Sequence, residues 1–283
     1  MRSARRHVID TDGRMVPVDV QRRNNVVVTG RADGPTLLLA HGFGCDQHLW
    51  RLVAPRLAER FRVVLFDHTG AGKSDRSAWS AQRYASLDAY AEDVLLLCRE
   101  LDLREVVLVG HSVSSMIGVL AANREPDRFA GLVLLAPSPR YLDDDGYRGG
   151  FSRDDIDELL ASLESNYLGW AATMAPVIMG TPDRPELGEE LTNSFCQTDP
   201  AIARVFARAT FLSDNRADLA AVTVPTLVVD SAQDAIAPPE VGRYVRDQIP
   251  GSTLVTLDTT GHCPQLSAPE AVVDAISVFT DAL

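Results

Sequence analysis

Residues Val106–Met116 read VVLVGHSVSSM, a β-rich apolar run that ends in Gly-His-Ser-Val-Ser and passes at once into a small-residue helical pattern. The stretch predicts a strand, a tight turn with Ser112 at its tip, and a helix. A serine on such a turn exposes its hydroxyl beside the N–H of Val113. The pattern is that of a nucleophile elbow, G-x-S-x-G, except that Ser114 stands where the second glycine is expected. The alternative is a buried turn whose serine only caps the helix.

The overall composition excludes several classes of protein. The chain has 283 residues, of which 46% are hydrophobic and 23% charged, so it can bury a sizeable core. Its net charge of −12 argues against nucleic acid and anionic membranes as partners. No apolar run approaches the roughly 20 residues of a membrane span, and no signal-peptide pattern follows the basic start. The scattered cysteines fit free thiols in a cytoplasmic protein better than disulfides or a zinc site, and they are Cys45, Cys98, Cys196 and Cys263.

Buried strands and helices alternate along most of the chain. Strands are expected at residues 25–29, 36–40, 62–66, 106–110, 131–136, 226–230 and 252–257. Helices are expected at residues 49–60, 87–101, from the elbow to about 125, and 268–283. Because continuous apolar runs mark strands that are covered on both faces, the pattern predicts an α/β fold with a mostly parallel sheet and helices on both sides.

One segment interrupts this alternation. Residues 139–219 contain no strand-like run but several helical stretches. The first begins at Ser152 with a capping-box pattern, and further helices are expected at residues 167–179, 185–197 and 199–212. We expect these residues to form a helical lid over a core made of residues 23–138 and 220–283. Residues 1–22 are polar and arginine-rich, and we expect them to form a flexible extension, either an added edge strand or a disordered arm.

Polar residues that can do chemistry follow the predicted strands. Ser112 follows one strand, Asp234 follows a later strand, and His262 comes just after the last. In an open parallel sheet such residues meet at the carboxyl ends of the strands. A serine hydroxyl is a weak nucleophile that needs a base, and the base needs an acid to fix its tautomer. The order Ser, Asp, His is that of the α/β-hydrolases, so we predict a triad of these three residues.

Other acids and histidines compete for these roles. Asp230 ends its strand and is a second candidate for the acid, although four more residues of loop give Asp234 a longer reach. The histidines His41 and His111 flank glycine turns and are expected to hold loops. By contrast, His48 and His68 could line the mouth of the site.

A glycine-rich loop, His41-Gly42-Phe43-Gly44, follows the strand at 36–40. Glycines let the backbone approach a ligand closely, so the N–H groups of Phe43 and Val113 could form a two-donor oxyanion hole. The alternative is a tight turn that simply needs glycine. A second glycine turn, Gly72-Lys73-Ser74, lacks the glycine that a phosphate-binding loop requires at position 67, and we expect no nucleotide, metal or other cofactor.

Further motifs are spread over residues 23–283, and they are His41–Gln47 with Trp50, Phe66-Asp67, Gly110–Ser114, Pro137–Tyr141, Gly149–Phe151, Asn166-Tyr167 with Trp170, Gly261-His262 and Leu266–Pro269. Together they resemble the group of α/β-hydrolases that contains the bacterial RsbQ-type stress-regulator hydrolases and the plant karrikin and strigolactone receptors. A serine at the fifth elbow position is a feature of that group.

The resemblance implies an α/β-hydrolase fold with a V-shaped lid of four helices over an apolar pocket. It implies the same triad and the same oxyanion donors. By analogy the pocket would be lined by Trp170, Met174, Phe195 and Phe211. The alternative for each of these four side chains is simple packing between lid helices.

Two functions follow as hypotheses. The first is a cytoplasmic serine hydrolase that cleaves a small hydrophobic ester or lactone slowly, through an acyl-enzyme and without a cofactor. The second, which rests on the resemblance, is a ligand sensor whose lid contacts a regulatory protein, expected to be a PAS-domain phosphatase that controls a stress sigma factor. Epoxide hydrolysis and dehalogenation need a carboxylate nucleophile, which Ser112 argues against, whereas cofactor-free peroxidation stays open.

Overall fold

The computed structural model describes residues 7–9, 15–17 and 19–283. Seven strands form the main sheet, and a separate two-stranded sheet pairs β1 with β2. The bounds of the strands are β1 His7–Ile9, β2 Met15–Pro17, β3 Val27–Gly30, β4 Thr36–Ala40, β5 Arg62–Leu65, β6 Val106–His111, β7 Phe129–Leu135, β8 Thr226–Gln233 and β9 Thr253–Thr260. The main sheet runs in the order β3-β5-β4-β6-β7-β8-β9, and only β3 is antiparallel to its neighbour.

The alternation of side chains along the strands divides the core into two layers. On β4, Leu38 faces one apolar cluster, whereas Leu37 and Leu39 face the other. Every residue of β4 is buried, which shows that both faces of the sheet are covered there. This explains why the central strands read as continuous apolar runs, and it confirms the predicted α/β fold with its mostly parallel sheet.

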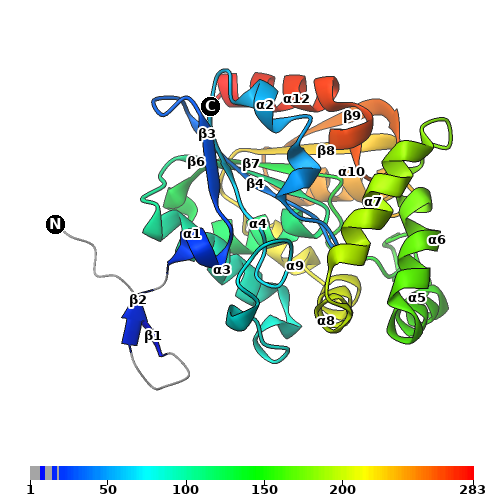
Figure 1. The fold of residues 1–283 in the computed structure, drawn as a ribbon. Helices are drawn as coiled ribbons and strands as arrows, with labels where there is room; N and C mark the ends of the chain where they lie inside the picture. The colour runs from blue at the N-terminus through cyan, green and yellow to red at the C-terminus, as the bar shows by residue number, and fades with distance from the viewer. Residues whose placement is uncertain (1–6, 10–14, 18) are drawn as a thin grey trace.

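Helices cover both faces of the sheet (Figure 1). Side chains of α3, α4 and α10 belong to one cluster, and side chains of α2 and α12 to the other. The bounds of the core helices are α1 Val20–Arg23, α2 Ala54–Leu57, α3 Leu87–Glu100, α4 Val113–Arg124, α9 Arg216–Leu219, α10 Pro239–Gln248, α11 Pro264–Ser267 and α12 Pro269–Asp281. Short 3-10 helices are η1 Gln47–Trp50, η2 Arg76–Ala78, η3 Arg83–Ala85 and η4 Pro126–Arg128.

Four consecutive helices lie together beside one end of the sheet (Figure 1). They are α5 Arg153–Ser165, α6 Tyr167–Met179, α7 Pro185–Gln197 and α8 Pro200–Phe211. Ser152 and Asp155 form the predicted capping box at the start of α5. These helices share an apolar cluster with residues of the loops after the strands, such as Cys45 and Cys263. No helix in the described ranges is long and apolar enough to cross a membrane.

Two sequence expectations need revision. The single helix expected at residues 49–60 is wrong, because the structure has the 3-10 helix η1, a turn and the short α2. Pro55 is the reason: it lacks an N–H and its ring collides with the carbonyl of the preceding turn, so a helix can begin there but cannot pass through it. At the other end, α1 crosses the expected border between residues 22 and 23, with Val20 buried in the core.

Candidate active site

The predicted elbow is present between β6 and α4. Ser112 has φ +56° and ψ −121°, a backbone conformation that residues other than glycine rarely adopt. Such a backbone costs about 1–3 kcal/mol and persists only where its surroundings hold it. Here the Ser112 N–H donates to the carbonyl of Leu135, at 2.8 Å. A Cβ on Gly110 would lie 2.4 Å from the Ser114 carbonyl oxygen, so the close approach of strand and helix requires glycine there.

Three side chains from three different loops form a continuous hydrogen-bonded series. Ser112 Oγ lies 2.7 Å from His262 Nε2, and His262 Nδ1 lies 2.7 Å from Asp234 Oδ2. All three residues are buried. Because an ionised carboxylate only accepts, the His262 ring donates from Nδ1 and keeps the Nε2 lone pair for the Ser112 hydroxyl. The arrangement can therefore remove a proton from the serine and stabilise the imidazolium that forms.

The backbone of His262 is held from two sides. Its N–H donates to the Ile178 carbonyl of lid helix α6 at 2.8 Å, and its carbonyl accepts from His111 Nε2 at 2.8 Å. The residue before it must be glycine: Gly261 has φ +90°, and a Cβ there would lie 1.8 Å from the Met179 carbonyl oxygen. Helix α6 and the elbow thus both hold the backbone of His262.

The two candidate acids differ in their partners. The Oδ1 atom of Asp234 accepts from the N–H groups of Ile236 (2.8 Å) and Ala237 (3.1 Å), which leaves Oδ2 facing the histidine. Asp230 is also buried, but within the described residues neither of its carboxyl oxygens has a hydrogen-bond partner. It lies against Gly242, where a Cβ would be 2.5 Å from Oδ2. The geometry therefore selects Asp234 as the partner of the histidine.

The buried carboxyl of Asp230 leads to a prediction on stability. Burial raises the pKa of Asp230, because an apolar environment disfavours the charged form. The folded state therefore loses stability as the pH rises above about 3.9, the pKa of an aspartate in the unfolded chain. The loss stops growing once the pH exceeds the raised pKa of Asp230 in the folded state. Asp230→Asn is expected to raise the Tm at pH 7, with a gain that shrinks as the pH falls toward about 4. Calorimetry across this range tests it, and a lower Tm at pH 7 would contradict it.

The triad opens into a small apolar cavity of about 40 Å³. Its lining residues are Phe43, Cys45, His111, Ser112, Tyr141, Trp170, Ile178, Leu191, Phe195, Thr210, Phe211, Ile236, His262 and Cys263. Three of the four side chains expected in the pocket, Trp170, Phe195 and Phe211, are among them. Met174 is not, because it packs half-buried against the lid cluster instead.

Aromatic rings form much of the cavity wall. The Phe43 ring lies with its centroid 6.1 Å from that of Trp170, and 6.0 Å from those of both Phe195 and Phe211, in edge-on arrangements. Rings at these separations and angles attract one another beyond their burial alone. The loop after β4 and the lid therefore pack together directly above the serine.

Tyr141 is a site residue to which the sequence analysis assigned no role. Its hydroxyl lies 3.5 Å from Ser112 Oγ, and burial raises the pKa of Tyr141 to about 12, so the hydroxyl stays protonated at neutral pH. The available signal was its place in a Pro-Ser-Pro-Arg-Tyr stretch just after β7, at the same edge of the sheet as the triad. A protonated hydroxyl here can donate to an oxygen of a bound molecule.

The expected oxyanion donors lie on either side of Ser112. Val113 is the first residue of α4, and the first amides of a helix have no carbonyl partner within it. Phe43 lies in the loop after β4, and within residues 19–283 its N–H donates to no backbone carbonyl. Gly42 packs against the elbow, since a Cβ there would lie 3.4 Å from Ser112 Cβ. Both amides are thus available near Ser112.

The remaining histidines have other surroundings. Burial lowers the pKa values of His41, His68 and His111, the last to about 3, so all three are neutral at pH 7. His68 is not among the residues that line the cavity above Ser112, and its ring is buried and bonded to Ser114. His48 lines a separate groove beside α7. Among the residues that the structure describes, no group of three His, Cys, Asp or Glu side chains could hold a metal ion.

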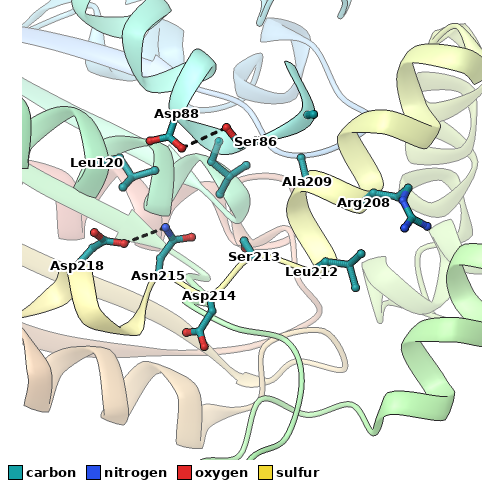
Figure 2. A pocket seen from close by; sticks show the side chains of 12 residues that line it. Ser86, Asp88, Leu120, Arg208, Ala209, Leu212, Ser213, Asp214, Asn215 and Asp218 are labelled. Carbon is teal, nitrogen blue, oxygen red and sulfur yellow. Dashed lines mark hydrogen bonds between the residues drawn. The ribbon is translucent and has the colours of Figure 1, made fainter. Parts of the chain in front are cut away.

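A groove of about 560 Å³ lies away from the triad, between α3 and the end of α8 (Figure 2). Its acidic side chains already have partners: Asp88 accepts from Ser86, and Asp218 accepts from Asn215. Asp214 is paired with Arg216. None of the triad residues lines this groove, so the small cavity above Ser112 is the candidate active site.

Comparisons with known proteins agree with this geometry. A family profile described as alpha/beta hydrolase fold matches residues 35–269. Strigolactone esterase D14 of Arabidopsis thaliana is 41% identical over 87% of this chain and 91% of its own length. Karrikin insensitive 2 receptor IA of Petunia hybrida is 38% identical over 85% of this chain and 88% of its own. A solved hydrolase from Oleispira antarctica superposes with a TM-score of 0.90 at 43% identity, covering 92% of this chain and 96% of that one.

Proposed function

This chain is a hydrolase of the α/β-hydrolase family, and we propose that it cleaves a small hydrophobic ester or lactone through an acyl-enzyme on Ser112. The observation that carries the proposal is the unbroken series of two 2.7 Å hydrogen bonds from Ser112 through His262 to Asp234. A serine with its base and a fixed acid is the arrangement that acyl transfer needs.

The reaction follows from the positions of these groups. Ser112 Oγ attacks the carbonyl carbon while His262 Nε2 takes its proton, and Asp234 stabilises the resulting imidazolium. The amides of Phe43 and Val113 donate to the oxyanion. When the tetrahedral intermediate collapses, His262 protonates the leaving alcohol. Water then loses a proton to the same nitrogen and attacks the acyl-enzyme, and His262 returns this proton to Ser112 Oγ as the acid leaves.

The cavity supports a small apolar acyl group as substrate. Its volume of about 40 Å³ has room for only a few atoms, whereas pockets for drug-sized ligands hold about 300–1,000 Å³. Its walls are mostly aromatic and aliphatic. The Thr210 hydroxyl, one of its few polar groups, already donates to the Phe206 carbonyl at 2.8 Å. Short-chain esters and compact lactones fit this enclosure, and longer chains require the lid to move.

Phe211 gives a test of this size limit. Its ring centroid lies 5.0 Å from that of Tyr141, so Phe211→Ala removes part of the cavity wall. We expect the ratio of kcat/KM for nitrophenyl hexanoate over nitrophenyl acetate to rise by about 10-fold or more, since each added methylene that finds room is worth about 1–3 kcal/mol. Phe279→Ala, on α12 at the far face of the sheet, is the control and leaves the ratio unchanged. An unchanged ratio in the Phe211 variant would contradict the assigned acyl pocket.

A mass measurement tests the acyl-enzyme directly. We expect a fluorophosphonate probe to add once to the protein, and peptide mapping to locate the adduct on Ser112. Brief acid quenching during turnover of a nitrophenyl ester is expected to trap an acyl group on the same residue. Labelling of another serine, or turnover with no adduct at all, would rule out this mechanism.

A second candidate function is ligand sensing with a regulatory protein bound at the lid. The observation that favours it is that relatives such as the petunia protein are named receptors. In this chain lid helix α6 carries no charged residue and exposes Leu168 and Val177. The proposed partner is a PAS-domain phosphatase from the same genome. Co-elution of the two purified proteins that requires a ligand and is lost in Val177→Glu supports this role, and no co-elution under any condition contradicts it.

A further inference from the structure

Three residues outside the triad form a closed hydrogen-bonded network next to it, through both side-chain and backbone groups. Ser114 lies in the first turn of α4, His41 follows β4, and His68 follows β5. The three strands β5, β4 and β6 are neighbours in the sheet, so their carboxyl ends bring these residues together. All three are buried, with Ser114 and His41 fully inaccessible to solvent. The proposed reaction uses none of these side chains.

The hydroxyl of Ser114 is the centre of the network. Ser114 Oγ donates to the His41 carbonyl oxygen at 2.5 Å and lies 2.7 Å from His68 Nε2. A serine hydroxyl has one proton, and a carbonyl can only accept it. The proton between Ser114 and His68 must therefore come from the ring, so His68 carries its hydrogen on Nε2. Within the described residues, its other ring nitrogen has no partner.

A second hydrogen bond closes the ring. The backbone N–H of His68 donates to His41 Nε2 at 3.0 Å, which leaves the His41 hydrogen on Nδ1, where it donates to the Gly42 carbonyl at 2.9 Å. His41 is thus held through both its ring and its carbonyl. The two imidazole rings also meet edge to face, with centroids 4.6 Å apart.

The peptide group held by this network leads directly into the loop that carries the Phe43 amide. Gly42 packs against the elbow, because a Cβ on it would lie 2.6 Å from His111 Nδ1. Rotation of the peptide between His41 and Gly42 would therefore change where the next amide points. An oxyanion hole stabilises a transition state only if its donors are oriented beforehand.

We propose that Ser114 and His68 are positioning residues, which hold the loop His41–Gly44 so that the Phe43 N–H faces the oxyanion formed at Ser112. The proposal rests on the proposed hydrolysis, and it assigns a role to the serine that replaces the second glycine of the elbow. Glycine at position 114 would allow strand and helix to pack but would leave the His41 carbonyl and the His68 ring without their common partner.

The rival explanation is that Ser114 and His68 only fill space. It predicts a lower Tm and normal turnover below the unfolding temperature. Positioning predicts a lower kcat with little change in KM, because orientation of the oxyanion donor matters in the transition state. A displacement of about 1 Å in a catalytic group can cost roughly 10²-fold in rate.

The decisive comparison uses two variants at position 68 and one at position 114. We expect Ser114→Ala and His68→Leu each to lower kcat for nitrophenyl acetate by about 10- to 100-fold, with KM within about 2-fold. His68→Gln keeps an N–H donor of similar reach and is expected to restore most of the loss. The double variant Ser114→Ala/His68→Leu is expected to be no slower than the worse single variant, because both substitutions break one network.

Ser115→Ala is the matched control. Its hydroxyl is equally buried one residue further on, but it donates to the Gly110 carbonyl at 2.8 Å and not to the loop. We expect it to lower the Tm about as much as Ser114→Ala does. Its kcat is expected to stay within about 2-fold of the unmodified protein, because the Ser115 hydroxyl makes no hydrogen bond to the loop His41–Gly44. Should Ser114→Ala fail to fold, the His68→Leu and His68→Gln pair decides the question.

Fluorophosphonate kinetics separate this proposal from the proposed hydrolysis. The probe forms a tetrahedral adduct with an oxygen in the oxyanion hole, so its rate of reaction with each variant is expected to fall in parallel with kcat/KM. If the unmodified protein does not react with the probe, the hydrolytic mechanism itself is wrong. A different result overturns only the positioning role: the unmodified protein reacts on Ser112, but the variants Ser114→Ala and His68→Leu hydrolyse the ester as fast as the unmodified protein does.

Discussion

Replacing Ser112 with alanine is expected to lower kcat for a nitrophenyl ester by about 10⁶-fold, the magnitude found when a serine nucleophile is removed. The Tyr141 hydroxyl, 3.5 Å from Ser112 Oγ, stays protonated because burial raises the pKa of Tyr141 to about 12, so it cannot take over the attack. Turnover of the variant is followed at high enzyme concentration with purified, separately expressed protein.

Stability is expected to change little in the same variant. Alanine has the same Cβ as serine, so the strain at φ +56° is unaltered. The variant loses the hydrogen bond to His262, worth about 1 kcal/mol, and the longer contact with Tyr141. The control is Ser74→Ala, which removes another buried hydroxyl, one that donates to the Ala71 carbonyl at 2.6 Å. It is expected to keep its turnover. Wild-type turnover in Ser112→Ala would show that the nucleophile lies elsewhere.

Replacing Asp234 with asparagine is expected to lower kcat by about 10⁴-fold, as when a triad acid is made an amide. The two backbone amides that donate to Oδ1 require an oxygen there, so the asparagine NH₂ group must take the place of Oδ2. It then donates to His262 Nδ1 and drives the ring hydrogen to Nε2. In that tautomer the ring cannot accept the proton of Ser112.

Asp230→Asn is the matched control for this substitution. The two carboxyls lie four residues apart, Asp230 within β8 and Asp234 directly after its last residue, and both are buried. Because Asp230 makes no contact with the histidine, its substitution is expected to leave kcat within about 2-fold, in line with independent sites. Equal losses in the two variants, or a loss only in Asp230→Asn, would overturn the assignment of Asp234 as the acid.

Much of the fold was predictable from local pattern. The apolar run at 36–40 matches β4 without a shift, and three lid helices begin and end within a residue or two of their expected places. These elements were readable because periodicity and capping residues act over a few neighbouring positions. The single helix expected at 49–60 does not form, although the apolar pattern there suits a helix. Pro55 prevents it, because its missing N–H and its ring disfavour a position inside a continuous helix.

Side-chain contacts between distant segments were less predictable. Met174 was expected in the pocket and lies outside it. Whether a residue of α6 faces the cavity or the adjacent helices depends on how the helix is rotated about its own axis. Tyr141 faces the serine because the loop after β7 turns back under the lid, with Asn215 donating to the Pro139 carbonyl at 2.8 Å. No periodicity in the sequence encodes either orientation.

By itself the sequence determined the α/β architecture and predicted that Ser112 and His262 meet one of two aspartates, Asp230 or Asp234, because strand ends in a parallel sheet share one edge. The tertiary structure decided which aspartate pairs with His262, since that depends on two loop amides that orient Asp234. It also decided what Ser114 contacts. A hydroxyl with no interpretable neighbour in the sequence joins three strand ends only once the sheet has formed.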